Sequence, residues 1–303
     1  MGKGMRAIPL IAASAAILIT ACSSSTSSSS SGAAGSASSS TAGASVQVKQ
    51  SGVLNIAADF SVPPNQYISN NQHDGIDVDL CTAIGKTLGL KVNWTNLPFD
   101  SLISGLQANR YDALCTGVFI TSPREQVMNM VPYVQWGVTM GVTKSTATTY
   151  DCTAQGGDFQ ACFAKFSGKT VATEAGGFEE QLLESANTKL QAAGKAPMKI
   201  LAFAQTTQAW QAFTNGTAQG VWVDDPQFYF LNTNNGGGQY VAAFGGDDPT
   251  PLALTTTIGN KSLAQAFVRA LQTLKSDGTY ATILKKWHVQ SVPSFTINPP
   301  VAS

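Results

Sequence analysis

The alternation of short apolar runs with helix-periodic runs most constrains the fold of this chain. Five such segments follow one another between residues 52 and 118, in the order strand, helix, strand, helix, strand. The same order of strands and helices returns between residues 169 and 232. Strands separated by helices pair in parallel, with right-handed crossovers. The sequence therefore predicts an α/β protein of two lobes, each a mostly parallel sheet flanked by helices, for which 303 residues suffice.

The individual segments are located by their hydrophobic period and by turn residues. Strands are expected at 52–58, 91–95, 111–118, 169–177 and 198–203, helices at 77–89, 99–109, 178–194, 206–216, 261–278 and 279–289, and a strand, turn and helix at 220–232. Asp100 is placed to cap the helix 99–109. The connection from Asp59 to Ile76 is long, which is typical of functional loops. Residues 245–260 are expected to be irregular.

The first 22 residues have the order of an export signal. Lys3 and Arg6 precede the apolar run "AIPLIAASAAILIT", which is too short to span a bilayer comfortably. The run ends in "LITAC", and a small residue directly before a cysteine resembles the lipobox of bacterial lipoproteins. That resemblance implies cleavage before Cys22 and a lipid on its sulfur. The alternative is an uncleaved amphipathic or membrane helix.

Residues 23–45 contain only Ser, Thr, Gly and Ala and carry no charge. Such a composition buries little apolar area, so it predicts a flexible tether between the anchor and a folded domain. Removing residues 1–21 takes away two of the 18 basic residues and leaves 16 against 18 acidic ones, a net charge near −2. The sequence has no surplus and no run of basic residues, which argues against a nucleic-acid partner. It also has no zinc-type spacing of Cys and His, which argues against a metal site.

Four cysteines remain after Cys22, and export permits disulfides. Cys152 and Cys162 bracket the segment "CTAQGGDFQAC", a Gly-rich turn, and are expected to pair. Cys81 lies on an expected helix and Cys115 on an expected strand. They are either a second disulfide where these elements touch or two ordinary buried thiols.

Ligands of open α/β sheets bind beyond the carboxyl ends of the strands. The residues at or just beyond the end of an expected strand are therefore the candidate binding residues. They are Asp59, Gly117, Phe119, Thr121, Arg124, Glu174, Gly176, Gly177, Asp224 and Asp225.

Two of these features suit an anion. Arg124 follows a proline at the expected start of a short helix, where the helix dipole disfavours a cation, and its planar fork matches a carboxylate. Gly176 and Gly177 precede a helix, whose first N–H groups favour negative charge. The alternatives are a surface pair of Arg124 with Glu125 or Glu179, and a plain tight turn at the two glycines.

Asp224 suits a cation. In "VWVDDP", Pro226 is a normal first helical residue and Asp225 a normal residue before it, so Asp225 is assigned to the helix start. Asp224 then has no capping role at the end of its strand, and an ammonium group is its natural partner. The alternative is a second solvated acid. A carboxylate receptor on one lobe and an ammonium receptor on the other describe the binding of an α-amino acid between them.

Four segments, in this order, resemble the extracytoplasmic solute-binding proteins (family 3) of bacterial ABC importers for polar amino acids. They are "GIDVDLCTAIGKTLGLKV", "YDALCTGVFITSPRE", "VWVDDP" and "LKSDGTYATILKKW". Each is weak alone, and together they are specific over about residues 52–289. The resemblance implies a two-lobed periplasmic-binding-protein-like fold of type II, with two segments crossing between the lobes and the lobes closing on ligand as a hinged clamp.

The expected organisation follows from these features. Residues 1–21 are a lipoprotein signal peptide, 22–45 a tether, 46–136 with 252–303 the first lobe, and 137–251 the second lobe.

The resemblance also implies a function. The chain is expected to be a non-catalytic, monomeric receptor, anchored by lipid at Cys22 outside the cytoplasm, that needs no cofactor and delivers a zwitterion to an ABC permease. By the same resemblance Arg124 binds the α-carboxylate and Asp224 the α-ammonium group, and Asp59 and Phe99 line the pocket.

The sequence departs from the family pattern around the ligand. Phe119 stands where a Ser or Thr is frequent, and Glu174 where a glutamine is common. In the family, a threonine often follows the glycine before the helix. Here that position is Gly177, and Phe178 comes next. The segment "VPPN", residues 62–65, replaces a tyrosine–proline–proline–aromatic loop.

These departures suggest a ligand class. Asp59, Glu174 and Asp224 oppose the single Arg124, so the pocket is expected to be net negative. Aromatic faces, which suit cations, come from Phe99, Phe119 and Phe178. The pattern favours a cationic amino acid or a related ammonium compound, unless Glu174 pairs with a lysine outside the cleft.

Two other functions are compatible with the sequence. One is a ligand-sensing subunit of a separate receptor or kinase. The other is a dehydratase or cell-wall lyase on the same fold, with a buried carboxylate such as Glu174 as general acid or base.

Overall fold

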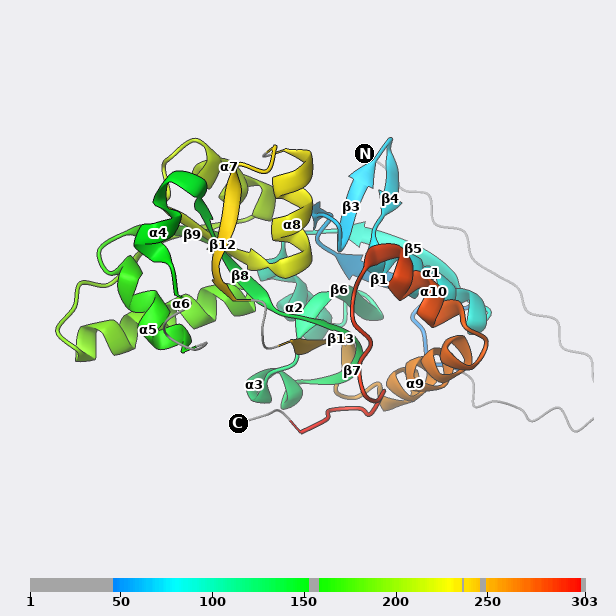
Figure 1. The fold of residues 1–303 in the computed structure, drawn as a ribbon. Coiled ribbons are helices and arrows are strands. Elements are labelled where there is room, and N and C mark those ends of the chain that lie inside the picture. Colours follow the sequence, from blue (N-terminus) through cyan, green and yellow to red (C-terminus); the bar gives the residue numbers. More distant parts are fainter. Residues whose placement is uncertain (1–45, 153–157, 236, 246–248, 301–303) are drawn as a thin grey trace, which may run out of the picture. The chain divides into compact units, whose positions relative to one another are not determined.

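The structure is a computed structural model that describes residues 46–152, 158–235, 237–245 and 249–300. These residues form two α/β lobes, each built on a five-stranded sheet, together with one three-stranded sheet (Figure 1). The predicted signal peptide, Cys22 and the predicted tether lie outside the described residues. Within the described part of the chain, every helix is too short or too polar to span a bilayer.

The first sheet has the strand order β5-β1-β6-β13-β7. Its strands are β1 (Val53–Ala58), β5 (Lys91–Asn96), β6 (Ala113–Phe119), β7 (Met128–Trp136) and β13 (Thr250–Thr257). β1 pairs in parallel with β5 and β6, whereas β13 pairs antiparallel with β6 and β7. The sheet is mixed because β7 leads out to the second lobe and β13 returns from it.

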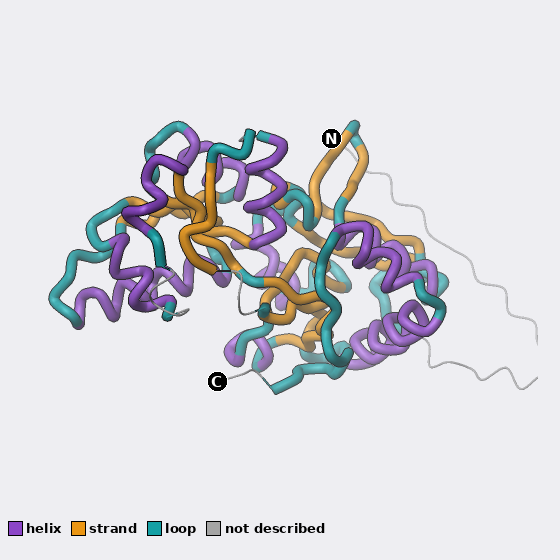
Figure 2. The backbone as a smooth tube through the Cα atoms, viewed as in Figure 1, coloured by secondary structure: helices purple, strands orange, loops and turns teal. Residues whose placement is uncertain are grey.

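Helices cover both faces of this sheet (Figure 2). The helices α1 (Ile76–Thr87), α9 (Lys261–Ser276) and α10 (Thr279–Trp287) pack together on one face, and α2 (Phe99–Gln107) packs on the other. Side chains of β1 alternate between these layers: Leu54 and Ile56 join the core with α1 and α9, and Ala57 joins the core with α2. The short helix α3 (Ser122–Glu125) leads from β6 to β7.

The second sheet repeats this plan with the order β10-β9-β11-β8-β12. Its strands are β8 (Val138–Thr143), β9 (Thr170–Glu174), β10 (Lys199–Phe203), β11 (Gly220–Asp224) and β12 (Tyr240–Gly245). β9 pairs in parallel with β10 and β11, and β8 pairs antiparallel with β11 and β12.

The second sheet is also covered on both faces. The helices α7 (Thr206–Thr214) and α8 (Asp225–Asn234) share a core with Val221 and Val223 of β11. Trp222 between them points to the other face, which is covered by α4 (Ala147–Tyr150), α5 (Phe159–Phe163) and α6 (Phe178–Ala192), with 3-10 turns at Lys144–Thr146 and Ala164–Phe166.

The long connection after β1 forms the three-stranded sheet, with β2 (Ser61–Val62), β3 (Gln66–Ser69) and β4 (Gln72–Asp74) in antiparallel order. Its β2–β3 turn caps α1 from outside: the carbonyls of Pro64 and Asn65 accept hydrogen bonds from the N–H groups of Ile76 and Asp77, at 3.1 and 2.9 Å. Gly75 before the helix has φ +129, and a Cβ there would lie 2.4 Å from the Asn65 carbonyl oxygen. This contact fixes Asn65 in place.

The expectation that residues 245–260 are irregular is wrong. They contain β13, which is paired on both sides inside the first sheet. The side chains of residues 252–256 are all buried, so the strand lacks the polar–apolar alternation by which a half-exposed strand is recognised.

The expectation that Asp100 caps α2 is also wrong. Pro98 occupies the N-cap position, and Asp59 supplies the acceptor instead: its Oδ2 accepts a hydrogen bond from the Phe99 N–H at 3.0 Å. A carboxylate distant in sequence replaces a local cap because it directly follows the neighbouring strand β1.

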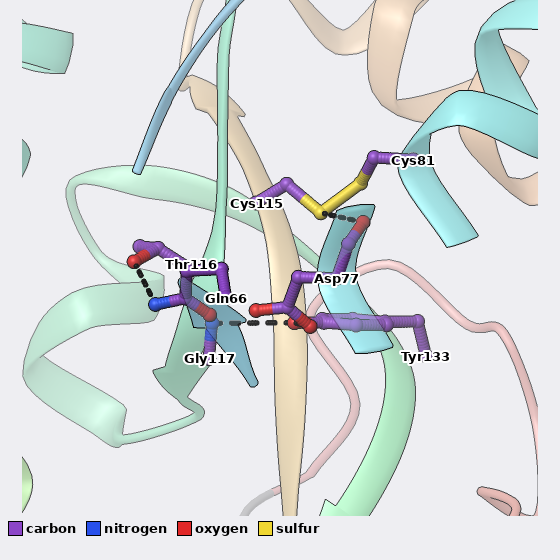
Figure 3. The surroundings of a disulfide bond; sticks show 7 residues. All are labelled: Gln66, Asp77, Cys81, Cys115, Thr116, Gly117 and Tyr133. Carbon is purple, nitrogen blue, oxygen red and sulfur yellow. Dashed lines mark hydrogen bonds between the residues drawn. A yellow bond between two sulfur atoms is a disulfide. The ribbon is translucent and has the colours of Figure 1, made fainter. Parts of the chain in front are cut away.

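Both candidate cysteine pairs are disulfides in the structure. Cys81 of α1 is bonded to Cys115 of β6, with their Cα atoms 6.7 Å apart, and Cys152 to Cys162, with 5.6 Å between Cα atoms. The first disulfide ties α1 to the strand whose end reaches the candidate site (Figure 3).

Candidate functional site

Seven predicted binding residues from the two lobes line one cavity beyond the strand ends. They are Phe99, Gly117, Phe119, Glu174, Gly177, Phe178 and Asp224, joined by Val62, Thr116 and Glu179. An adjoining cavity reaches into the second lobe, and its further walls are Thr173, Thr206, Trp222, Val223 and Gln227. Each encloses about 20 Å³, which is room for about one water molecule. An amino acid therefore enters only when the lobes move apart or these side chains rearrange.

A larger cavity of about 410 Å³ lies elsewhere, beside Trp136 and Gly137 at the crossing from β7 to β8. Tyr229 and Trp287 are among its walls. Of the candidate residues, its walls contain Asp225 alone, which the sequence assigned to a helix start. We place the candidate site at the smaller cavities because the strand-end residues of both sheets converge there.

Arg124 lies on α3 with only 6% of its surface exposed. Its Nη1 donates to the Phe119 carbonyl oxygen at 3.0 Å, and its guanidinium carbon lies 5.6 Å from the centre of the Phe99 ring. Nη2 reaches the Gly176 carbonyl oxygen of the other lobe at 3.5 Å. Burial lowers the pKa of Arg124 and the charge of Glu179 raises it, but arginine's ordinary pKa is so high that the group stays a cation.

The surface ion pair considered for Arg124 does not occur. Among the described residues, none of the acidic oxygens is within 4.0 Å of its guanidinium. The group is instead held by the Phe119 and Gly176 carbonyls and by the face of the Phe99 ring, none of which neutralises its charge.

Asp224 closes β11 and faces the cavity, with 7% of its surface exposed. Its Oδ2 accepts a hydrogen bond from the Asn65 side-chain amide at 2.8 Å. Its Oδ1 is buried and receives no hydrogen bond from a donor group within the described residues. Burial, followed by the charge of Glu179, raises the pKa of Asp224 well above its ordinary value.

Three carboxyl groups thus share one cavity: Asp224, Glu174 and Glu179. Glu174 Oε1 accepts a hydrogen bond from the Thr206 hydroxyl at 2.7 Å. Burial, followed by the charge of Asp59, raises the pKa of Glu174 well above its ordinary value. Acids so close together lose protons reluctantly, so the cluster favours a cation in its midst.

The glycine pair before α6 is not an open anion site. The Gly176 N–H donates to Glu180 Oε2 at 2.7 Å, so a carboxylate of the same helix already occupies this helix end. Gly176 has φ +75, and a Cβ there would lie 3.0 Å from the Asp100 Cα atom of the other lobe. The glycine therefore permits close approach of the two lobes. Gly177 alone of the pair lines the cavity.

A buried hydrogen-bond chain supports the cavity wall in the first lobe (Figure 3). The Gly117 N–H donates to the Tyr133 hydroxyl at 3.2 Å, and this hydroxyl donates to Asp77 Oδ1 at 2.5 Å. Beside it the Gln66 amide donates to the Thr116 hydroxyl at 2.9 Å. Burial is the main reason that the pKa of Asp77 is raised to about 7.

Four of the predicted residues lie outside the walls of the two small cavities: Asp59, Thr121, Arg124 and Gly176. Asp59 is buried and both of its oxygens are occupied, one by the Phe99 N–H and the other by the Ser61 N–H at 2.8 Å. Thr121 is the residue before α3, and its carbonyl accepts from the Glu125 N–H at 3.0 Å.

The assignment of Asp225 needs correction. α8 begins at Asp225 itself, with Asp224 in the N-cap position and Pro226 following. The Asp225 side chain accepts a hydrogen bond from the Thr139 hydroxyl rather than capping the helix. The helix starts one residue earlier than the position of Pro226 suggested, while Asp224 still faces the cavity.

Sequence reasoning missed several residues at the site. Asn65, Glu179, Thr206 and Gln227 lie on loops or helix starts with no periodic signal of their own. Only Glu179 had a usable signal, as an acid in the first turn after the glycine pair. Groups of three or more His, Cys, Asp or Glu side chains with metal-binding geometry do not occur within the described residues.

The fold and this site define a class of protein: two α/β lobes, crossed by two segments, with residues of both lobes around one cavity whose charged groups are carboxyl groups of the second lobe. A sequence profile of the bacterial extracellular solute-binding proteins, family 3, matches residues 54–290, and the chain belongs to this family.

Two known sequences illustrate the relationship. ABC transporter arginine-binding protein 1 of Escherichia coli (strain K12) is 29% identical over 257 residues, which cover 82% of this chain and 95% of that protein. The L-cystine-binding protein TcyA of Bacillus subtilis (strain 168) is 26% identical over 247 residues, which cover 81% and 84% of the two chains.

Solved structures agree with the fold. An ancestral arginine-binding protein bound to arginine superposes with a TM-score of 0.69 and 26% identity, covering 78% of this chain and 98% of that one. The ancestral amino acid-binding protein AncCDT-1, described as a precursor of cyclohexadienyl dehydratase, gives a TM-score of 0.67 and 25% identity, covering 78% and 95%. The two-lobed type II fold predicted from the sequence is confirmed.

Proposed function

We propose that this chain is an extracytoplasmic receptor that binds a cationic amino acid between its lobes and delivers it to an ABC permease. In this proposal Arg124 binds the α-carboxylate and Asp224 the α-ammonium group. The observation that carries it is one buried guanidinium on the first lobe, in contact with the cavity residues Phe99 and Phe119, while three carboxyl groups of the second lobe line the same cavity.

Charge counting supports a cationic ligand. A neutral zwitterion brings one positive charge to Glu174, Glu179 and Asp224, whereas an amino acid with a cationic side chain brings two. Unpaired buried carboxylates are costly, so the second positive charge offsets more of that cost. Aromatic rings support the same reading. Phe119 and Phe178 line the cavity and pack against each other with 4.9 Å between ring centres, so a ligand that separates them would meet aromatic faces, which suit a cation.

The names of the relatives point the same way. Several similar proteins and structures are described as arginine-binding. L-arginine is therefore the first ligand to test.

Calorimetric titration of the purified protein tests the proposal. L-arginine, L-lysine and L-ornithine are compared with L-glutamine, L-cystine and L-glutamate, after bound solutes have been removed by unfolding and refolding. We expect tight binding of at least one cationic amino acid and no measurable binding of L-glutamate. Tight binding of glutamate, or of neutral amino acids alone, would contradict the cationic assignment.

Attachment to the membrane is proposed from the sequence. "LITAC" and the charge-free stretch that follows support a lipid at Cys22 and a tether. In a bacterial host, metabolic labelling with palmitate should mark the parent protein and not the Cys22→Ser variant. Equal labelling of the two proteins would refute the anchor.

An enzymatic function has one specific observation in its favour. Glu174 combines burial with a raised pKa, as a general acid requires, and one structural relative is described as a dehydratase precursor. Incubation with prephenate or arogenate tests this alternative. Product formation that is abolished in Glu174→Gln would establish catalysis and displace the receptor proposal.

A further inference from the structure

The chain beyond α10 crosses the first lobe and reaches, at Asn298, the helix that carries Arg124 (Figure 1). The crossing begins where the Gln290 carbonyl accepts a hydrogen bond from the Gln135 N–H of β7 at 3.3 Å. The family profile ends at residue 290. Residues 291–300, here named the C-terminal strap, therefore lie beyond the part of the chain that defines the family.

The C-terminal strap is anchored along its length. The Val292 N–H donates to the Tyr280 hydroxyl at 3.3 Å, and Val292 is 2% exposed. The ring of Phe295 meets that of Tyr280 edge to face, with 5.4 Å between centres. These contacts give the strap a fixed path on the lobe, so its last residues reach a defined place.

That place is the turn between α3 and β7, which Asn298 binds through four hydrogen bonds. Its Oδ1 accepts from the Met130 N–H at 2.6 Å, and its Nδ2 donates to the carbonyls of Glu125 and Met128 at 3.0 and 3.3 Å. Its backbone N–H donates to the Met130 carbonyl at 2.8 Å. Asn298 has φ +47, a left-handed conformation that asparagine tolerates better than most residues.

These bonds matter because α3 has only four residues, from Ser122 to Glu125. A helix of one turn is not stable by itself, and its last carbonyls need donors from elsewhere. Asn298 supplies a donor to the last residue of α3 and also binds the first residues of β7. The strap thus binds the backbone of the segment that carries Arg124, while the Phe119 carbonyl binds the guanidinium itself.

We propose that Asn298 is a positioning residue for Arg124, which makes the C-terminal strap a determinant of affinity for ligands that carry a carboxylate. This inference rests on the proposed function, in which Arg124 binds the α-carboxylate. A carboxylate that is bound at two points needs a guanidinium in a fixed position. The affinity therefore falls when the segment that supports the guanidinium shifts by a fraction of an ångström.

The test compares L-arginine with agmatine, which has the same guanidinium and an ammonium group but no carboxylate. Affinities are measured by calorimetry for L-arginine and by ligand-observed NMR at millimolar concentration for agmatine. We expect Asn298→Ala to weaken L-arginine about tenfold and agmatine less than twofold, relative to the parent protein. Thr296→Ala is the matched control, because this exposed strap residue bonds only to the Ser294 hydroxyl in the described structure, and it should leave both affinities unchanged.

A second variant guards against misfolding. Asn298→Asp keeps the acceptor for the Met130 N–H, and near-ultraviolet circular dichroism checks that it is folded. A carboxylate oxygen replaces the donor to the Glu125 and Met128 carbonyls and repels them, so this variant should weaken L-arginine at least as much as Asn298→Ala does. Equal losses for the two ligands, or no loss in either variant, would overturn the inference while leaving the receptor function intact. If the parent protein binds neither ligand nor any other amino acid, the proposed function fails, and this inference fails with it.

Discussion

The side-chain amide of Asn65 donates a 2.8 Å hydrogen bond to Oδ2 of Asp224, across 159 positions of sequence. Asn65 belongs to the turn that caps α1 in the first lobe, and Asp224 ends β11 in the second. The bond stabilises one oxygen of a carboxyl group whose other oxygen is buried and accepts no hydrogen bond from the described part of the chain. It therefore connects the closing of the lobes to the charge state of the proposed ammonium receptor.

Removal of that donor should weaken ligand binding. In Asn65→Ala, Oδ2 of Asp224 loses its hydrogen bond, so the pKa of Asp224 should rise further and the ionised form that binds a cation becomes rarer. A hydrogen bond to a charged group contributes roughly 1.5 to 3 kcal/mol, and we expect at least a tenfold loss of affinity for L-arginine. Calorimetry at pH 7 measures it. Unchanged affinity would show that the bond is incidental to binding.

Arg124 should be irreplaceable by lysine. Arg124→Lys keeps a positive charge but loses the planar fork, which donates to the Phe119 carbonyl and in the proposed complex also contacts the ligand carboxylate at two points. We expect about a hundredfold loss of affinity for L-arginine in Arg124→Lys and a larger one in Arg124→Ala. Arg110→Ala, at an exposed position of the same lobe, is the control. An Arg124→Lys variant that binds as the parent does would remove Arg124 from the site.

Binding of a cation should release protons. The pKa of Asp224 and that of Glu174 are both raised, chiefly by burial, so each carboxyl holds a proton above its ordinary range, and a bound cation favours the ionised form. Affinity should therefore rise with pH across that raised range. Calorimetry in two buffers of different ionisation enthalpy counts the released protons. Asp224→Asn should release fewer than the parent, and pH-independent binding in the parent would contradict the scheme.

Asp77 should make the ligand-free protein less stable as pH rises. Its pKa in the folded protein is about 7, against an ordinary value of 3.8, so the folded state binds this proton more tightly than the unfolded state. Below pH 3.8 Asp77 is protonated in both the folded and the unfolded state. As the pH rises from 3.8 to 7, the unfolding free energy falls by about 4 kcal/mol in total, because the unfolded state loses this proton first.

Unfolding by urea at a series of pH values checks this. The slope of unfolding free energy against pH should be shallower in Asp77→Asn than in the parent. Asp100→Asn, which alters an exposed carboxylate of the same lobe, should keep the parent slope. Superimposable curves for parent and Asp77→Asn would show that Asp77 does not titrate as inferred.

The disulfide between Cys81 and Cys115 should contribute more to stability than the one between Cys152 and Cys162. The two close loops of 34 and 10 residues, and loop-closure entropy predicts about 4 and 3 kcal/mol. Paired Cys→Ala variants, compared by denaturant unfolding, measure both. The Cys81–Cys115 variant should also weaken ligand binding, because Cys115 lies two residues before Gly117 at the cavity wall. A larger loss in the other variant would reverse the ranking.

Much of the fold was predictable because it is encoded locally. The hydrophobic period of each strand and helix is set by residues a few positions apart. This holds for β1, α1, β5, α2 and β6 and for the matching elements of the second lobe. The strand-end rule then led to Arg124 and Asp224 without any knowledge of contacts. β13 was not predicted because it is buried on both faces. A strand without polar–apolar alternation resembles any other apolar run of the sequence.

The sequence by itself determined the two-lobed α/β class, the strand ends that carry the charged groups, and the family. Only the tertiary structure decided that Asp59 caps α2, that Asn65 bonds to Asp224, that Glu180 fills the glycine turn, and that Asn298 binds the turn after Arg124. The physical reason is that periodicity records which face of an element is buried, whereas a hydrogen bond between distant segments depends on where the packed elements bring them.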